Sequence, residues 1–193
     1  MTHVRLNLRG VTSLIVDRDH FTRSLVAQMI RGFGMEGPTL VDSAAAAKEH
    51  LRHSCVDLCI MEAVLPDAAS PELISWIRRQ NKPPLCFIPI IVLSGYTQLR
   101  MVNAARDAGA NFVVRKPVSP QGLFDRIAWV ARADRPFIET GTYMGPDRRF
   151  LSIDPPDNAR KRSGDDCACT GDHDGALLAP NGLVSALKKG GSL

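Results

Sequence analysis

The sequence predicts an α/β fold in which five parallel strands form a doubly wound sheet with helices on both faces. Over the first 133 residues, short runs rich in Val, Ile and Leu alternate with longer segments whose apolar residues recur every three or four positions. Unbroken apolar runs are typical of strands buried on both faces of a parallel sheet. The alternation predicts βα units joined by right-handed crossovers, a flavodoxin-like (βα)5 arrangement.

The strands are expected where short β-branched runs occur. They are residues 11–16, 37–41, 57–61, 88–93 and 111–115, of which 37–41 carries the weakest pattern.

The helices are expected between these runs. They are residues 20–33, 44–52, 71–79, 98–108 and 119–132. Ser43 can accept a hydrogen bond at the start of the second helix, and Ser119-Pro120 is a favourable start for the last. Gly34 and Gly109 provide stops for the first and fourth helices.

The chain divides into a short leader (1–10), one α/β domain (11–133) and an extension (134–193) rich in Pro and Gly. The extension has few large apolar residues, so we expect it to be largely irregular and partly disordered. One short amphipathic helix is possible within it, from Leu177 to Leu187. The whole chain has 193 residues, of which 45% are hydrophobic and 23% charged, which is a globular composition.

Several classes of protein are not indicated. No apolar run approaches the roughly 20 residues that span a bilayer, and the N-terminus lacks the apolar stretch of a signal peptide. The five cysteines do not suggest a disulfide framework, so a cytoplasmic location is expected. No nucleotide-binding glycine motif, catalytic triad or DNA-binding helix-turn-helix pattern is present, so neither enzyme activity nor direct DNA binding is predicted.

Polar residues follow the predicted strands at their carboxyl ends, where ligands collect in a doubly wound sheet. Asp17-Arg18-Asp19 follows the first strand and Glu62 follows the third, whereas Ser94 and Lys116 follow the fourth and fifth. Two acids, a hydroxyl and a lysine should therefore meet in one pocket.

These residues also carry a resemblance to a known family. The runs LIVDRDHFTRSLV, CIMEAVLPD, IIVLSG and VVRKP occur in order at compatible spacing. Over roughly residues 11–132 they resemble the receiver domain of response regulators, the CheY-like family of bacterial two-component signalling. The resemblance implies that Asp17 matches a Mg²⁺-binding acid and Glu62 the phosphoacceptor aspartate. It also implies that Ser94 matches the switch hydroxyl and Lys116 the phosphate-pairing lysine.

Three positions depart from that family. Glu62 stands where an aspartate accepts phosphate, Arg18 stands where a second metal-binding acid is expected, and Val113 stands at the usual position of a switch aromatic. Arg18 supplies no oxygen ligand and could take part of the cation's space, which disfavours Mg²⁺. The extra methylene of Glu62 displaces its carboxylate by about 1.5 Å. We therefore expect a degenerate receiver that works without phosphorylation. The longer reach of Glu62 could imitate the phosphorylated state, and the sequence does not decide whether it locks an active-like state.

Other interpretations of the pocket remain. The chain could be a conventional receiver that accepts phosphate on Glu62 or another acid. Asp19 could supply a metal ligand, or it could simply cap the helix that it precedes. Arg18 and Glu62 could also form a local ion pair with no signalling role.

The face formed by residues 98–132 is a candidate surface for a protein partner. It offers Arg100, Asn103, Arg106 and Arg126, with Arg132 at its end. A histidine kinase, a motor or a scaffold component are the candidate partners, and the same face could form a homodimer. An ordinary solvated basic surface is an equally good interpretation.

The extension contains Gly-Pro-Asp-Arg-Arg, which resembles extensions after receiver domains of some alphaproteobacterial proteins. Arg148 and Arg149 could bind an anion or a nucleotide second messenger such as a cyclic dinucleotide. We favour instead a segment that folds back on its own receiver or onto a second copy. Cys167-Ala-Cys169 with His173 is an incomplete match to a zinc site, and we favour a solvated loop there.

Overall fold

The predicted parallel sheet is present. The computed structural model describes residues 8–80, 82–95, 99–132, 137–140, 143–147 and 177–178. The five strands lie in the order β2-β1-β3-β4-β5. They are β1 (Ser13–Val16), β2 (Thr39–Val41), β3 (Leu58–Glu62), β4 (Ile90–Ser94) and β5 (Phe112–Arg115), all parallel to their neighbours.

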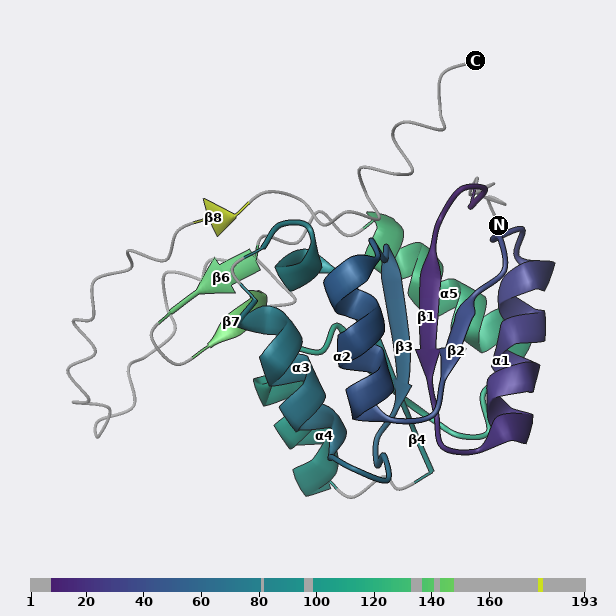
Figure 1. Cartoon of the computed structure of the whole chain (residues 1–193), viewed down its shortest axis with the longest axis horizontal. Helices are drawn as coiled ribbons and strands as arrows, with labels where there is room; N and C mark the ends of the chain where they lie inside the picture. Colours follow the sequence, from purple (N-terminus) through teal and green to yellow (C-terminus); the bar gives the residue numbers. More distant parts are fainter. Residues whose placement is uncertain are drawn as a thin grey trace, which may run out of the picture.

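Five α-helices cover the two faces of this sheet, as the alternation predicts (Figure 1). They are α1 (His20–Gly32), α2 (Ala44–His53), α3 (Ser70–Arg78), α4 (Leu99–Asp107) and α5 (Pro120–Arg132). No helix within the described residues has the length and apolar character needed to cross a membrane.

The two faces of the sheet have separate cores because successive strand residues point to opposite sides. On one face, Leu14 and Cys59 pack with buried residues of α2, α3 and α4. On the other face, Ile15 and Ile60 pack with buried residues of α1 and α5. Every residue of β1 and β4 is buried, which explains their unbroken apolar runs.

Side chains close to the strand ends begin the helices. Asp19 caps α1 by accepting a hydrogen bond from the Thr22 amide, and Ser43 caps α2. Asp67 adds to the second cap, because its two oxygens accept from the first two amides of α2 at 2.8 Å each. The first amides of a helix have no hydrogen-bond partner within the helix, so hydrogen bonds from them to a carboxylate are favourable.

The extension contains structure that the sequence did not predict. Strands β6 (Phe137–Glu139), β7 (Met144–Pro146) and β8 (Leu177–Leu178) form an antiparallel sheet in the order β7-β6-β8. The helix predicted from Leu177 is therefore wrong at its first two residues. The remainder of that segment lies outside the described residues.

The β6–β7 hairpin packs against the receiver domain beside α3 (Figure 1). Phe137 is fully buried, and its ring meets that of Phe87 edge to face at 5.2 Å. Phe87 belongs to the short 3-10 helix η1 (Leu85–Phe87) that precedes β4. The backbones also touch: a Cβ on Gly109 would lie 2.6 Å from the carbonyl oxygen of Met144. This fits the expectation that part of the extension folds back on its own domain.

Candidate functional site

The candidate site lies at the carboxyl ends of the parallel strands, as the topology predicts. Asp17 directly follows β1, Glu62 ends β3, Ser94 ends β4 and Lys116 directly follows β5. The crossovers thus bring together residues that are up to 99 positions apart in the chain.

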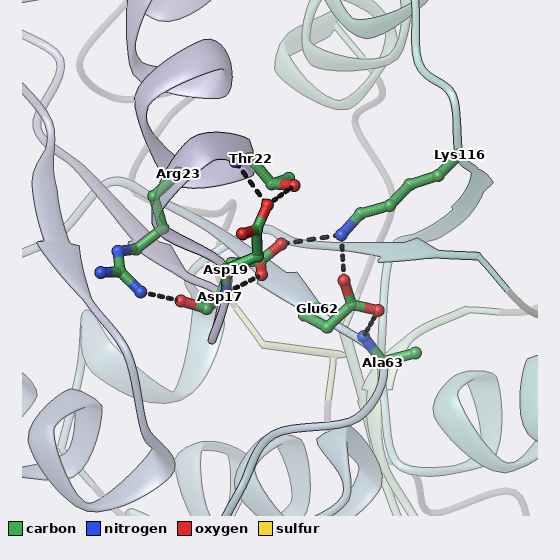
Figure 2. Close-up of polar contacts among 7 residues, drawn as sticks. All are labelled: Asp17, Asp19, Thr22, Arg23, Glu62, Ala63 and Lys116. Atoms are coloured by element: carbon green, nitrogen blue, oxygen red, sulfur yellow. Dashed lines mark hydrogen bonds and ion pairs between the residues drawn. The ribbon is translucent and has the colours of Figure 1, made fainter.

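Lys116 is the centre of this site (Figure 2). Its ammonium group lies 2.7 Å from Oδ2 of Asp17 and also contacts Oε2 of Glu62. The second oxygen of each acid accepts a backbone hydrogen bond, from the Asp19 amide at 2.8 Å and from the Ala63 amide at 3.1 Å. Lys116 therefore bridges two carboxylates, each of which also accepts a hydrogen bond from a backbone amide.

The Lys116 cluster, as we call Asp17, Glu62 and Lys116, is largely shielded from water. The side chains of these residues are 4%, 14% and 21% exposed, respectively. Burial by itself lowers the pKa of Lys116, but hydrogen bonds to Asp17 and Glu62 and the charges of both acids outweigh it. The net result is a raised pKa, so Lys116 is charged at neutral pH.

Arg18 does not occupy the position that the sequence suggested. Its side chain is exposed and forms no hydrogen bond or ion pair with any residue that the structure describes. The side chain of a residue between a strand and a helix can point into the site or out to solvent. The charge of Arg18 alone therefore could not predict which way its side chain points. Glu62 pairs with Lys116 rather than with Arg18.

Arg23 is a second cation that sequence reasoning missed. It projects from the first turn of α1, and its Nη1 donates to the backbone carbonyl of Asp17 (Figure 2). The sequence spacing could have predicted this contact. Arg23 lies four residues after the cap Asp19, so the two residues share one side of the helix.

Asp19 acts as a helix cap. Its Oδ2 accepts from the amide of Thr22 at 2.8 Å and from the hydroxyl of Thr22 at 2.5 Å. The hydroxyl bond, followed by the amide bond, holds the pKa of Asp19 below its ordinary value. A carboxylate committed in this way matches the capping interpretation of the sequence.

The switch positions are both in place on the sheet. Ser94 is buried, 3% exposed, at the end of β4. Val113 is half-buried in β5, paired with Val92, and packs into the core on the α2–α3–α4 side.

The candidate partner face is exposed as expected. Arg100, Asn103 and Arg106 are exposed on α4, and Arg126 and Arg132 are exposed on α5. Leu99, at the start of α4, is 72% exposed. The guanidinium of Arg126 lies 5.5 Å from the ring centroid of Phe112, which in turn packs edge to face on Trp129. Cation–π contact of this kind tethers Arg126 over β5.

A buried arginine was also missed. Arg78, at the end of α3, is 2% exposed and donates five hydrogen bonds, to the carbonyls of Cys86, Ile88 and Gly109 and to Oδ1 of Asn111. Desolvation lowers the pKa of Arg78 to about 10. Its guanidinium carbon lies 5.1 Å from the ring centroid of Phe137. Arg78 lies four residues after buried Ile74, and that spacing placed it on the buried face.

The structure gives little information on the metal and anion sites considered from the sequence. Among the described residues, no group of three or more His, Cys, Asp or Glu side chains could hold a metal ion. Arg148, Arg149, Cys167, Cys169 and His173 lie outside the described residues.

Comparison with known proteins places the parallel-sheet part in one family. A model of the response regulator receiver domain matches residues 13–128. The transcriptional regulatory protein GltR of Pseudomonas aeruginosa is 28% identical over 127 residues, which are 66% of this chain and 51% of that protein. A cyclic di-GMP phosphodiesterase of Thermotoga maritima is 26% identical over 122 residues, which are 63% of this chain and 31% of that protein.

Solved structures agree on the fold. A CheY-like response regulator receiver domain protein from Methanospirillum hungatei superposes with a TM-score of 0.56 at 24% identity, over 61% of this chain and 90% of that one. The match to GltR and to the phosphodiesterase covers about half of those proteins or less, so it concerns the shared domain alone.

Proposed function

Since this chain belongs to the response regulator receiver family, we propose that it is a two-component signalling protein whose receiver works without phosphorylation. The observation that carries the proposal is the Lys116 cluster, in which one ammonium group bridges Asp17 and Glu62. We further propose that its output is binding of a protein partner and not catalysis.

The position of Glu62 supports this proposal. Its Oε2 contacts Lys116 and its Oε1 accepts from the Ala63 amide, so both oxygens are engaged within the protein. An attacking carboxylate must be aligned with the phosphoryl group, and a shift of about 1 Å is enough to reduce the rate severely. The longer glutamate side chain already makes the lysine contact that a phosphoryl group on a shorter aspartate would make.

The ligands present suit Mg²⁺ poorly. Mg²⁺ needs near-octahedral oxygen ligands. Here Oδ2 of Asp17 is held by Lys116, Asp19 is engaged by Thr22, and Arg18 supplies no oxygen. Phosphoryl transfer without the metal loses most of its charge stabilisation.

The partner surface that we propose is the exposed side of α4, β5 and α5. Receiver domains act on partner proteins such as kinases, and this side combines one strongly exposed leucine with several exposed arginines. A partner with an apolar anchor for Leu99 and carboxylates for Arg100 and Arg106 would complement it. The helix α4 itself carries one acid, Asp107, so a second copy docked through the same helix would offer few carboxylates.

Incubation of the full chain with acetyl phosphate and Mg²⁺, followed by intact mass spectrometry, tests the proposal. We expect no added phosphoryl group. The matched control is the double variant Arg18→Asp/Glu62→Asp, which restores two acids of the length that the family uses and should gain the adduct. A stable phosphoryl adduct on the unaltered chain would refute the proposal.

A further inference from the structure

A groove between α2 and α3 has the features of a small-molecule site that the signalling function does not use. Its volume is about 510 Å³, within the usual range of ligand pockets. It is lined by Lys48, Pro71, Glu72, Ser75, Trp76 and Arg79. The two helices lie side by side on the same face of the sheet (Figure 1). None of these residues belongs to the Lys116 cluster.

One stripe of α3 and its C-terminal cap forms most of the groove. Glu72, Trp76 and Arg79 are spaced by four and three residues, so they share a face of the helix. Seven residues of helix separate Glu72 from Arg79, which is about 10 Å along the axis. The stripe therefore places an acceptor at one end, an aromatic ring in the middle and a cation at the other end.

Two cations of α2 lie over the aromatic ring of Trp76. Nζ of Lys48 lies 5.8 Å and Cζ of Arg52 lies 5.7 Å from the ring centroid of Trp76. Trp76 is half-buried, with part of its ring packed on the core. An anion placed against this ring would thus be close to Lys48 and Arg79, while Arg52 is already paired with Glu49 at 3.1 Å.

The polar side chains that α3 and its C-terminal cap contribute to the groove are not committed elsewhere. Among the described residues, the side chains of Glu72, Ser75 and Arg79 have no hydrogen-bond or ion-pair partner. A ligand could therefore use these three groups without breaking a protein contact, whereas stacking on Trp76 would displace Lys48 and Arg52 from its ring.

From this arrangement we propose that the α2–α3 groove binds a guanine nucleotide. The base stacks on Trp76, its N1–H and amino group donate to the Glu72 carboxylate, and the phosphate pairs with Lys48 and Arg79. Glu72 favours a guanine nucleotide over an acidic peptide. Its carboxylate would repel the acidic peptide, whereas it can accept hydrogen bonds from both N1–H and the amino group of guanine. A bare phosphate would leave both Trp76 and Glu72 without a role.

The chain has two tryptophans, which allows a direct test. In the Trp129→Phe variant of the full chain, Trp76 is the sole tryptophan, and stacking should quench its fluorescence. GMP is the probe, with AMP and inorganic phosphate as matched controls. We expect saturable quenching by GMP and at least tenfold weaker binding of AMP, on the order of a 1.4 kcal/mol difference.

Two further variants separate the contacts. Glu72→Gln should remove the preference for GMP over AMP, whereas Arg79→Ala should weaken both nucleotides about equally. Calorimetry of GMP with the unaltered chain checks that Trp129→Phe has not changed the groove. Absence of saturable binding at about 10 mM GMP, equal binding of AMP, or an unchanged preference in Glu72→Gln would each overturn the proposal.

Discussion

Lys116 determines the electrostatics of the site, because among the described residues it is the one group that neutralises both Asp17 and Glu62. Its partners are 4% and 14% exposed, so water screens their charges only partly. Removing one member of such a set leaves the others unpaired in a poorly hydrated place.

Lys116→Met should therefore lower the free energy of unfolding by about 2–3 kcal/mol, less than a fully buried pair because Lys116 is still 21% exposed. Urea denaturation at neutral pH measures this. Glu62→Gln keeps the shape, leaves the Asp17 pair intact and should cost less than half as much. An equal cost for the two variants would contradict the central role of Lys116.

The raised pKa of Lys116 fixes the pH at which this contribution is lost. Because the folded-state pKa lies above that of the unfolded chain, the stabilisation is complete below about pH 10 and declines as pH rises through the folded-state value. The stability difference between the unaltered chain and Lys116→Met should thus be constant from about pH 7 to 9 and shrink above about pH 10.5. A difference that already shrinks between pH 7 and 9 would argue against a raised pKa.

At the scale of elements, the β6–β7 hairpin is the part that distinguishes this chain from a bare receiver. Phe137 covers the guanidinium of Arg78, which itself joins the end of α3 to η1 and to the turn before β5. The hairpin thus covers the C-terminal end of α3, where the ring of Phe137 packs on the buried guanidinium of Arg78.

Phe137→Ala should destabilise the fold by about 3–5 kcal/mol, since it empties a fully buried site and exposes Arg78. Glu139→Ala, on the same strand but exposed, is the matched control and should have almost no effect. Thermal unfolding of the two variants gives the comparison. Equal stability would mean that the hairpin contributes nothing to the receiver.

Gly109 provides a separate check on hairpin docking. Its φ is +105°, and a Cβ there would meet the Met144 carbonyl at 2.6 Å. Gly109→Ala should therefore displace β7 and speed amide hydrogen exchange across β6 and β7, in addition to straining its own backbone. Gly37→Ala, where a Cβ meets nothing within 4 Å, is the control. Unchanged exchange in the hairpin of Gly109→Ala would contradict this packing.

Elements with strong patterns were predicted well from the sequence. Each parallel strand begins one or two residues later than predicted, and the caps at Ser43 and Asp19 are confirmed. The hairpin was missed because strands of three residues carry no measurable alternation, and Gly and Pro dominate its β7. The direction of Arg18 was missed because the chain turns there, and a charge does not specify which way a side chain points.

At the scale of the whole molecule, the structural unit extends past the family match. The receiver match ends at residue 128, whereas contacts with the receiver continue through β7. The buried end of α3 is thus completed by residues that the shared domain does not contain.

Shortened chains test this boundary. A chain ending at residue 132 should lose about 3–5 kcal/mol, as Phe137→Ala does, which lowers Tm by roughly 10–15 °C. A chain ending at residue 147 keeps the hairpin and loses only β8 of the described strands, so its Tm should stay within a few degrees of the full chain. Equal Tm values for both shortened chains would place the boundary at the end of α5.

The most direct test of the central claim is an NMR titration of the full chain with Mg²⁺ and beryllofluoride, a mimic of the phosphoryl group. If Lys116 holds both carboxylates, the amide signals of Asp17, Glu62, Ala63 and Ser94 should not move. Saturable shifts at these residues that require both Mg²⁺ and beryllofluoride would show that the site accepts metal and phosphate, and would contradict the account.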